Sequence, residues 1–546
     1  MTLVQLQAIA GGNMMTRKSF RAMLCANLIL LAGFVRAAPM SCEALGKVSL
    51  PQTTISLAQS TAADIFTPPV PDWAKAFMHP KPVPAAFCRV VGHLHPTGDS
   101  DIKFEVWLPV SRWTGRYESV GNGGFAGFIR YDSMVNPLLA GSVVASTDDG
   151  HDAPAVGPTA ADWALGHREK IIDYGYRAAH LTAVASKAIA AAFYGRAPAH
   201  SYFVGCSKGG QEGYMESQRY PKDFDGIISG AAANDWVHLF TSFVWNESVN
   251  LAGREGYLTL EDFKNIDKVV MNGCARAGDA EHGFLSDPLQ CRVKADALRL
   301  APAKLHTYEL IHEGPRDRAG QQVFAGQPYG SELNWSDVVS TANFEKAETD
   351  AQMSMYGGNF FRNFVYEDRN WSFKNLDLDK TLKDALEIGK IMNATDVTFK
   401  GFKARGGKFI AYAGLSDSIV TPLSSEHYYR SVVAAQDRVP AAALAKTQKF
   451  YRLFLAPGVG HCGGGPGPNE FGQAGGAGDA EHDLVVALER WVEQGVAPTR
   501  IIATKYNGDD HAKGVAMTRP LCPFPQVAKY TGSGDVADAR SFVCVD

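Results

Sequence analysis

The sequence predicts an α/β fold built on a mostly parallel sheet, and three observations lead to that prediction. Residues 101–230 alternate between strand-like and helix-like segments, which is the rhythm of βαβ units. Ser207 lies in a glycine-rich turn between a strand-like run and a helix-like run. The rhythm stops near residue 233 and returns near residue 395, so we expect residues 233–394 to be an insertion within one domain.

The predicted strands are short runs that are apolar or alternate between apolar and polar residues. Several of them lead into glycine-rich or acidic turns, and the segments between them include long runs that are typical of helices. The expected strands are 102–108, 116–120, 141–146, 201–204, 408–413 and 449–456, and the expected helices are 174–194, 211–220 and 480–495.

Residues 233–394 are rich in aromatic side chains and contain no clear buried strand. This composition predicts an inserted domain that divides the α/β domain into a first part, 38–232, and a second part, 395–546. The aromatic side chains either stack on a phenolic ligand or pack a core, and the sequence leaves both interpretations open. They are Trp236, Phe240, Phe243, Trp245, Tyr329, Trp335, Tyr356, Phe360, Phe361, Phe364 and Trp371.

The N-terminus has the features of a signal peptide. Residues 17–21 are basic, residues 22–35 are apolar, and Ala37 ends a stretch that resembles a cleavage site. The apolar run is too short to span a bilayer comfortably. We therefore expect residues 1–37 to be removed and the mature chain to be secreted or periplasmic, with an uncleaved anchor as the alternative.

The composition argues against several classes of partner. With 53 basic and 57 acidic side chains, nothing in the charge favours nucleic acid or a membrane surface. The 546 residues, 46% of them hydrophobic, suffice to bury a large core. The sequence leaves open the oligomeric state, a translation start at Met14 or Met15, and glycosylation at Asn246, Asn334, Asn370 and Asn393.

Eight cysteines remain after Cys25, which lies inside the apolar run of the signal peptide. An even number in an exported chain predicts disulfides, and no Cys-x-x-Cys spacing suggests zinc. The connectivity stays open, although Cys274 with Cys291 and Cys522 with Cys544 are natural local pairs. All eight are expected to be bonded: Cys42, Cys88, Cys206, Cys274, Cys291, Cys462, Cys522 and Cys544.

Ser207 is the candidate nucleophile. A strand, a tight glycine-rich turn and a helix form the geometry that lifts a serine hydroxyl above the edge of a sheet. The glycines around Ser207 permit the unusual backbone angles of such a turn. If Cys206 pairs with Cys462, their Cα atoms lie about 4.4–6.8 Å apart. One peptide step at each end then puts the Cα atoms of Ser207 and His461 within roughly 14 Å.

A serine hydroxyl needs a base, and that base needs an orienting carboxylate. His461, in a Gly/Pro-rich loop after a strand, is the expected base, and a structural loop histidine is the alternative. Asp417, in the loop after the strand 408–413, is the expected acid, with a turn-capping aspartate as the alternative. The chain order Ser, Asp, His is that of α/β-hydrolases.

An oxyanion hole needs two backbone N–H donors. The expected donors are Lys208, which follows the nucleophile, and Gly124, in the glycine-rich loop 121–124; a simple loop is the alternative for Gly124. A polar cluster after the strand 141–146 either supports this site or forms an ordinary turn, and it consists of Asp148, Asp149 and His151.

Together these residues resemble the tannase and feruloyl esterase family. The hallmark of that family is a Cys-Ser, Asp, His-Cys arrangement, which falls here on Cys206-Ser207, Asp417 and His461-Cys462. The resemblance implies a disulfide between Cys206 and Cys462 and an α/β-hydrolase fold with a large inserted lid domain over the site. Further matching segments are 121–127, 145–151, 450–467 and 519–523.

The resemblance also bears on cofactors. Members of the family often bind calcium in a lid loop between two cysteines, which here is the loop between Cys274 and Cys291. The positions that carry side-chain oxygens in the family fall on Ala275, Gly278 and His282, and a hard cation needs several oxygen ligands. We therefore expect neither calcium nor any other cofactor or metal.

The resulting prediction is a secreted serine esterase that hydrolyses aromatic carboxylic esters of feruloyl or galloyl type through an acyl-enzyme on Ser207. The expected partner is a small aromatic ester, with no nucleic acid and no membrane after signal cleavage. A terephthalate-monoester hydrolase or a general carboxylesterase is the alternative within the same class. An inactive hydrolase-like binding protein is the alternative from another class.

Overall fold

The structure is a computed structural model that describes residues 38–75, 78–152, 157–476 and 478–546. The expected signal peptide, residues 1–37, lies outside the described residues. Residues 38–546 form one compact unit. No helix in the described ranges combines the length and the apolar character that a membrane crossing requires.

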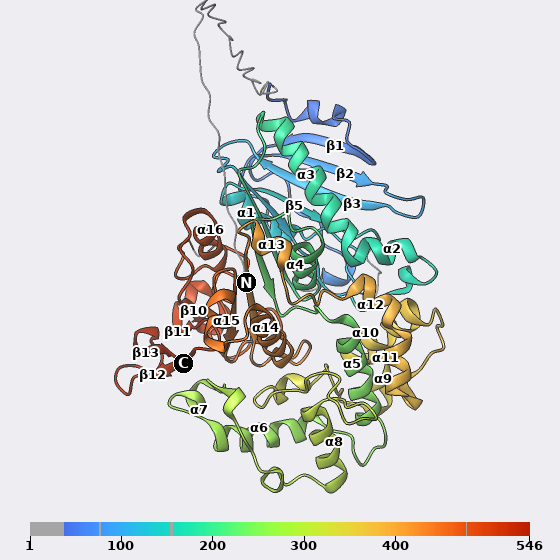
Figure 1. The fold of residues 1–546 in the computed structure, drawn as a ribbon, viewed down its shortest axis with the longest axis vertical. Coiled ribbons are helices and arrows are strands. Elements are labelled where there is room, and N and C mark those ends of the chain that lie inside the picture. Colours follow the sequence, from blue (N-terminus) through green and yellow to red (C-terminus); the bar gives the residue numbers. More distant parts are fainter. Residues whose placement is uncertain (1–37, 76–77, 153–156, 477) are drawn as a thin grey trace, which may run out of the picture. The chain divides into compact units, whose positions relative to one another are not determined.

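A nine-stranded sheet forms the centre of this unit, with the spatial order β1-β2-β3-β5-β4-β6-β7-β8-β9 (Figure 1). The first three pairings, from β1 to β5, are antiparallel, and the five pairings from β5 to β9 are parallel. The predicted mostly parallel α/β fold is thus confirmed. The strands are β1 Thr53–Thr61, β2 Phe87–Leu94, β3 Ile102–Pro109, β4 Arg116–Val120, β5 Val143–Thr147, β6 His200–Cys206, β7 Gly226–Gly230, β8 Lys408–Gly414 and β9 Tyr451–Ala456.

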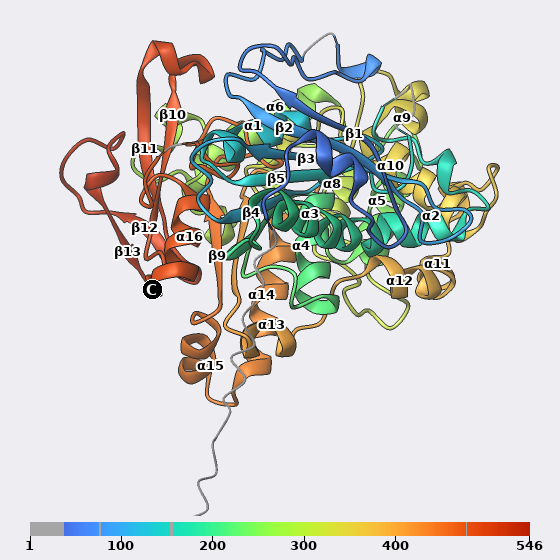
Figure 2. The same cartoon turned by 90° about the horizontal axis from the view of Figure 1, so that it is seen from above.

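Helices cover both faces of the sheet, which is why β5 and β7 are buried along their whole length. Helices α3, α4 and α14 lie on one face, and α1 and α16 lie on the other (Figure 2). Their apolar side chains pack against the strands in separate core clusters. Two peripheral hairpins follow near the C-terminus. The helices of the α/β part are α1 Tyr131–Leu139, α2 Arg168–Ile172, α3 Ala178–Tyr194, α4 Lys208–Arg219, α13 Lys400–Ala404, α14 Pro422–Gln436, α15 Pro440–Thr447 and α16 Leu484–Gln494. The hairpin strands are β10 Ile501–Tyr506, β11 Val515–Leu521, β12 Val527–Tyr530 and β13 Phe542–Val545.

The inserted segment, residues 233–394, lies between β7 and β8 and consists of helices and loops (Figure 1). Its helices pack into an apolar core that also includes residues of the α/β part, such as Phe125, Ile171 and Tyr174, and most of the aromatic side chains noted in the sequence contribute to it. The helices are α5 Trp236–Asn250, α6 Leu260–Cys274, α7 Asp279–His282, α8 Pro302–Glu313, α9 Phe344–Asp350, α10 Gln352–Phe360, α11 Leu378–Asp384 and α12 Leu386–Met392.

Four disulfides join the eight cysteines of the described residues. They are Cys42–Cys88, Cys206–Cys462, Cys274–Cys291 and Cys522–Cys544. Disulfides persist in oxidising compartments such as the periplasm or the extracellular space. The covalent structure is therefore consistent with an extracellular or periplasmic protein.

Candidate active site

Ser207 occupies the turn between β6 and α4, with φ 62° and ψ −119°. A positive φ is unusual for a residue with a side chain, and such strain concentrates at functional sites. The turn is tight because glycines flank it: a Cβ on Gly205 would lie 2.4 Å from the Gly209 carbonyl oxygen. The sequence pattern thus produces a sharp turn that holds the serine at the carboxyl end of a parallel strand.

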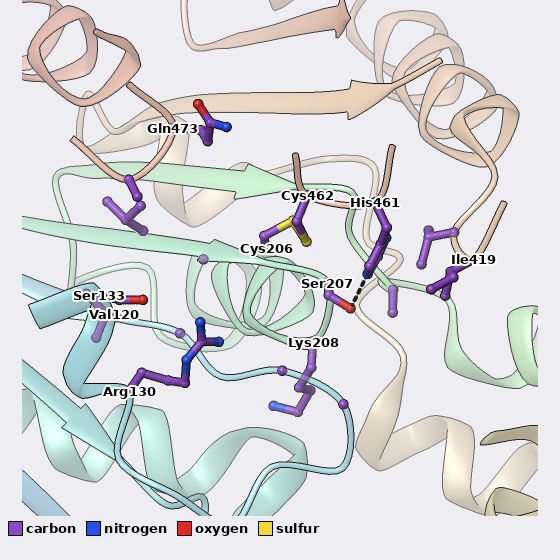
Figure 3. Close-up of a pocket in the computed structure, with 18 of the residues that line it drawn as sticks. Val120, Arg130, Ser133, Cys206, Ser207, Lys208, Ile419, His461, Cys462 and Gln473 are labelled. Atoms are coloured by element: carbon purple, nitrogen blue, oxygen red, sulfur yellow. Dashed lines mark hydrogen bonds between the residues drawn. A yellow bond between two sulfur atoms is a disulfide. The ribbon is translucent and has the colours of Figure 1, made fainter. Parts of the chain in front are cut away.

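A hydrogen-bonded chain joins Ser207, His461 and Asp417 (Figure 3 shows the first pair). The His461 Nε2 atom lies 2.9 Å from Ser207 Oγ, and the His461 Nδ1 atom lies 2.7 Å from Asp417 Oδ2. With the proton on Nδ1, the imidazole donates to Asp417 and accepts from the serine hydroxyl. The structure therefore brings together three side chains from segments that are far apart in the sequence.

Backbone donors hold the Asp417 carboxylate in place. This side chain is fully buried, and its Oδ1 atom accepts hydrogen bonds from the N–H groups of Ile419 (2.8 Å) and Val420 (3.0 Å). The other oxygen, Oδ2, is left to receive the imidazole. Asp417 consequently both caps its own turn and orients His461, so the two interpretations that the sequence offered for it are compatible.

The environment of His461 raises the pKa of the imidazole above its ordinary value. Burial alone lowers this pKa, but the negative charge of Asp417 and the hydrogen bond to it raise it by more. The protonated imidazole is therefore stabilised, as a base that must hold a proton during a reaction requires. A neutral imidazole is needed to accept the serine proton, so activity is lost as the pH falls through the raised pKa.

Replacing Asp417 with asparagine is expected to move the acid limb of kcat/KM to lower pH, because the charge that raises the pKa of His461 is removed. The same change should lower kcat by about 10⁴-fold, since the amide no longer selects the reactive tautomer. The measurement is the pH dependence of kcat/KM for wild type and variant. An acid limb at the same pH in both proteins would show that Asp417 does not control His461.

A disulfide joins the backbone of the nucleophile turn to the loop of the base. Cys206 precedes Ser207 and Cys462 follows His461, and their Cα atoms are 5.8 Å apart. Figure 3 shows the sulfur bridge beside the Ser207–His461 hydrogen bond. The covalent link therefore limits how far the serine and the imidazole can separate.

Two backbone N–H groups beside Ser207 are available to a ligand. Lys208 and Gly124 both line the cavity at the serine. Within the described ranges, neither backbone N–H donates to a protein acceptor, whereas the neighbouring Gly123 N–H donates to the Asn122 side chain and the Phe125 N–H to the Pro158 carbonyl. Unpaired N–H groups at a cavity are suited to hold a developing oxyanion.

The glycine-rich loop that contains Gly124 is held by buried hydrogen bonds. The Asn122 side chain donates to the Thr147 carbonyl (2.8 Å), and the Asn122 N–H donates to the Glu212 carboxylate (3.1 Å). Burial lowers the pKa of His151 to about 3, so this imidazole is neutral and its Nε2–H donates to the Phe125 carbonyl at 2.6 Å. His151 thus supports the loop, as one of the two interpretations of the 148–151 cluster anticipates.

A buried cation lies behind the nucleophile. Lys208 Nζ is 2.6 Å from the Glu212 carboxylate and 3.6 Å from Asp149, and it sits 4.4 Å from the centre of the Tyr174 ring. Burial and the nearby Glu212 charge raise the pKa of Asp149 well above its usual range. Sequence reasoning missed this network, although the i, i+4 spacing of Lys208 and Glu212 on a helix is a signal for such a pair.

The cavity at Ser207 has a volume of about 440 Å³ and two chemically different walls. One wall comes mainly from the inserted segment and is aromatic or aliphatic: Trp236, Leu239, Phe240, Phe243, Tyr356, Ile419 and Val420. The other wall comes from the α/β core and contributes the polar side chains of Glu118, Arg130, Asp132, Ser133 and Gln473; Figure 3 shows Arg130, Ser133 and Gln473 on the other side of Ser207 from Ile419. The inserted aromatic side chains therefore both pack a core and line the cavity.

The polar wall carries little net charge. Arg130 pairs with Asp132 through Nε–Oδ1 (3.2 Å) and Nη2–Oδ2 (3.0 Å), and Figure 3 shows the Arg130 side chain directed toward the cavity. Although burial raises the pKa of Asp132, the hydrogen bond and charge of Arg130 lower it by more. Burial and neighbouring carboxylates raise the pKa of Glu118 to about 8, so Glu118 is neutral at pH 7. No motif in the sequence pointed to these residues.

The loop between Cys274 and Cys291 does not fit a calcium ion. Its one fully buried carboxylate, Asp279, is saturated by donors: Oδ2 accepts from the N–H groups of Arg276 and Ser286 at 2.9 Å each, and Oδ1 accepts from the Ser286 hydroxyl. Asp287 forms an ion pair with Arg276 at 2.7 Å. Calcium requires six to eight free oxygen ligands, and these oxygens already have partners.

The protein supplies a cation of its own near this loop. Arg519 is buried, and burial lowers its pKa to about 10 against the opposing effect of the Asp279 charge. Its guanidinium lies 3.8 Å from the centre of the Phe542 ring. An arginine charge within electrostatic reach of Asp279 further disfavours a metal ion there.

Comparison with known proteins places this arrangement in a family. The family model described as tannase and feruloyl esterase matches residues 88–545. The chain is 38% identical to an uncharacterized esterase of Xanthomonas campestris pv. campestris, over 93% of this chain and 92% of that one. It is 30% identical to a probable feruloyl esterase B-1 of Aspergillus fumigatus, over 84% of this chain and 86% of the relative. The crystal structure of feruloyl esterase B from Aspergillus oryzae superposes with a TM-score of 0.79 at 25% identity, covering 92% of this chain and 99% of that chain.

Proposed function

The chain belongs to the tannase and feruloyl esterase family and is a carboxylic ester hydrolase, and from that premise we propose a serine esterase that cleaves esters of aromatic carboxylic acids. The observation that supports this proposal is the hydrogen-bonded chain Ser207–His461–Asp417 at a cavity with an aromatic wall. An exported location, with residues 1–37 as the signal, is part of the proposal.

In the proposed first step, His461 Nε2 takes the proton of the Ser207 hydroxyl as Oγ attacks the ester carbonyl carbon. The N–H groups of Lys208 and Gly124 hold the carbonyl oxygen as it becomes negative. The imidazolium then gives its proton to the departing alcohol oxygen, and the acyl group remains on Ser207. Asp417 keeps the imidazole oriented and stabilises its positive charge.

In the second step, His461 takes a proton from a water molecule, and the resulting nucleophile attacks the acyl carbonyl. Collapse of the tetrahedral intermediate breaks the bond to Oγ, releases the carboxylic acid and returns the proton to Ser207. The fixed geometry serves both steps, because the same imidazole acts first as a base and then as an acid. No metal takes part in this scheme.

The two walls of the cavity suggest how the ester lies. Flat aromatic side chains such as Trp236 and Phe240 favour an aromatic ring by stacking or edge contacts. The polar wall then receives the alcohol part. A panel of methyl ferulate, methyl gallate and a terephthalate monoester tests the acyl preference, and fast turnover of only short aliphatic esters would contradict it.

Replacing Arg130 with methionine is expected to lower kcat/KM about tenfold for a feruloyl ester of a polyhydroxylated alcohol. The arginine donates hydrogen bonds to hydroxyl groups of that alcohol, and the loss of one such charged hydrogen bond costs roughly 1.5–3 kcal/mol. The methyl ester should change by less than about twofold, since a methyl group makes no such bond. Methionine keeps much of the apolar stem. Equal losses for both esters would show that Arg130 acts on the common acyl part or on the fold.

A further inference from the structure

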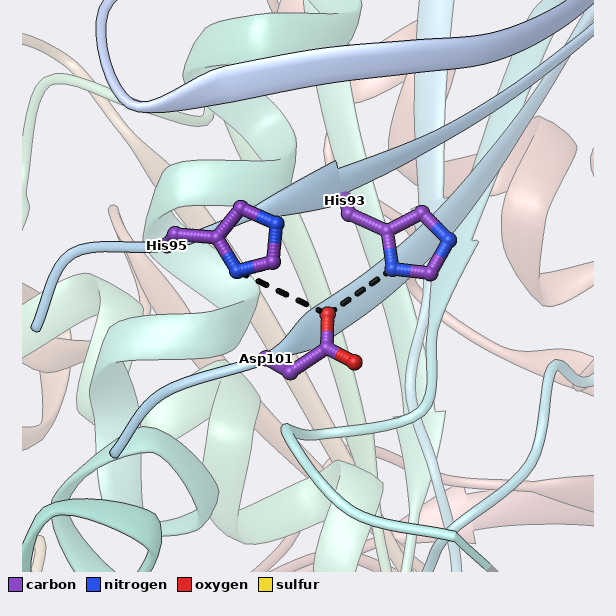
Figure 4. Close-up of side chains that lie close together, drawn as sticks. All are labelled: His93, His95 and Asp101. Atoms are coloured by element: carbon purple, nitrogen blue, oxygen red, sulfur yellow. Dashed lines mark hydrogen bonds and ion pairs between the residues drawn. The ribbon is translucent and has the colours of Figure 1, made fainter. Parts of the chain in front are cut away.

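Two histidines and an aspartate meet at one end of the β2–β3 hairpin, outside the cavity (Figure 4). His93 Nδ1 lies 2.8 Å from Asp101 Oδ1, and His95 Nδ1 lies 3.7 Å from the same oxygen. One ligand atom from each of the three side chains lies within 4.8 Å of the other two. The three groups therefore lie close together, and the His95 Nδ1 atom also lies 3.2 Å from the Ser100 carbonyl oxygen, a partner that a metal ion would replace.

The hairpin fixes this arrangement through its backbone. His93 and His95 are two residues apart along an extended chain, so their side chains emerge on the same side. The buried pair Leu94 and Ile102 sets the register of β2 against β3, and the His95 N–H donates to the Gln52 carbonyl at 2.8 Å. The nearly parallel imidazole rings, 17° apart with centroids at 6.0 Å, follow from this geometry.

The spacing of the donor atoms matches a tetrahedral metal. Zinc binds imidazole nitrogen at about 2.0–2.1 Å and carboxylate oxygen at about 2.0–2.2 Å. Tetrahedral angles then place neighbouring ligand atoms about 3.3–3.4 Å apart. Two of the three separations, 2.8 Å and 3.7 Å, bracket that value, and the third, between the two imidazole nitrogens, is at most 4.8 Å, so small side-chain rotations that bring the imidazoles together would complete the site.

The chemistry of the donors also favours zinc over harder cations. Imidazole suits zinc and other late divalent metals, whereas calcium and magnesium prefer sets composed of oxygen. The side chains of His93, His95 and Asp101 are 29%, 48% and 52% exposed, so an ion can enter and water can fill a fourth position. Thiolates do not compete, because every cysteine of the described ranges is in a disulfide.

We propose that His93, His95 and Asp101 form a zinc-binding site at the β2–β3 hairpin. A zinc ion held at the ends of both strands would bind the folded chain and not the unfolded chain. Such binding stabilises the native state, because it shifts the unfolding equilibrium toward the folded chain. The neighbouring Lys103 ammonium is directed to Asp152, with which it forms an ion pair, and this pairing reduces its repulsion of a cation.

A second cluster of possible ligands is less suited to zinc. His180, Glu216 and Asp223 also approach one another. There, however, the Lys187 ammonium donates to the Asp223 carbonyl at 2.7 Å and lies 4.0 Å from the Asp223 carboxylate, so the protein already supplies a cation. This cluster serves as the competing site that the experiment must separate from the first.

The test is a zinc titration of the chelator-treated full chain by calorimetry, with the cobalt(II) absorption spectrum as a second readout. We expect one zinc ion per chain in the tightest class of site and a tetrahedral cobalt band. His93→Ala and Asp101→Asn should each weaken this site at least about tenfold, since loss of an outer partner alone costs about 10–100-fold. His482→Ala is the matched control, because His482 is an exposed histidine with a single aspartate partner, Asp479, at 3.0 Å.

The variants are expected to fold, because the replaced side chains lie at the surface, and melting temperatures without zinc should match that of wild type. The melting temperature of wild type and His482→Ala should rise with zinc, and that of His93→Ala should not. Zinc affinity that is unchanged in both His93→Ala and Asp101→Asn would overturn the proposal, as would the absence of a tetrahedral cobalt band. A loss of affinity in His180→Ala but not in His93→Ala would assign the zinc to the competing cluster.

Discussion

Replacing Ser207 with alanine is expected to abolish ester turnover while the protein still folds and binds substrate. The hydroxyl is the only group removed, and it is the group that His461 contacts at 2.9 Å. Members of a catalytic triad act as a unit, so the loss should be on the order of 10⁴–10⁶ in kcat. The measurement is the turnover of methyl ferulate by the purified variant, with substrate binding and melting temperature as controls.

Two outcomes decide how this result is interpreted. A variant with an unchanged melting temperature and near-normal turnover would exclude Ser207 as the nucleophile. A variant that neither folds nor binds would leave the role to be decided by His461→Ala, which removes the base from a different loop. His461→Ala should reduce turnover to a similar extent, because the serine proton then has no acceptor in the protein.

Removing the disulfide between Cys206 and Cys462 is expected to cause the second large loss. The bond closes a loop of 256 residues, and in the chain-entropy account such a link contributes about 5 kcal/mol of stability. It also joins the backbone on either side of the Ser207–His461 contact. A shift of about 1 Å between reacting groups costs roughly a hundredfold in rate. Cys206→Ala/Cys462→Ala should therefore lose activity even well below its own melting temperature.

The matched control is Cys522→Ala/Cys544→Ala. This pair joins Cys522, directly after β11, to Cys544 in β13, away from the residues that line the cavity. It should lower the melting temperature and leave kcat nearly unchanged when the assay temperature lies below the transition. If both double variants kept full activity at such temperatures, the Cys206–Cys462 bond would have a role in stability alone.

The sequence predicted the parts of the site that depend on local structure. The glycines around Ser207 require a tight turn, and the positions of Asp417 and His461 after predicted strands bring them to the same edge of a parallel sheet. Cys206 adjoins Ser207, and Cys462 adjoins His461. A disulfide between the two cysteines therefore limits the distance between the serine and the histidine. Such inferences succeed because each rests on chain geometry over a few residues.

The parts that the sequence did not predict depend on contacts between distant segments. Strands β1 and β2 extend the sheet at its antiparallel edge, and no expected strand covered them. The helix expected to start at residue 174 begins earlier, at Arg168 with α2, and a π-helical turn, Asp173–Arg177, separates α2 from α3. A sequence pattern gives the period of a helix, but tertiary packing decides where that period is interrupted.

The polar groups of the cavity show the same limit. Arg130 and Asp132 are two residues apart at the start of α1, and only the folded chain brings them to the cavity at Ser207. The Lys208–Glu212 pair follows from helical spacing, but its burial beside Asp149 and Tyr174 does not. Whether an ionic pair is buried depends on the side chains around it, and those side chains come from strands and helices that are far apart in the sequence.

Labelling with a fluorophosphonate, followed by peptide mapping, tests the central claim most directly. The reagent bonds to a serine hydroxyl that a nearby base has activated, so it reports the Ser207–His461 contact in the native enzyme. We expect a single stoichiometric adduct on the peptide that contains Ser207, loss of turnover in proportion to labelling, and no adduct in His461→Ala. An active enzyme that takes no label at Ser207, or one that is labelled at another residue as it loses activity, would contradict the account.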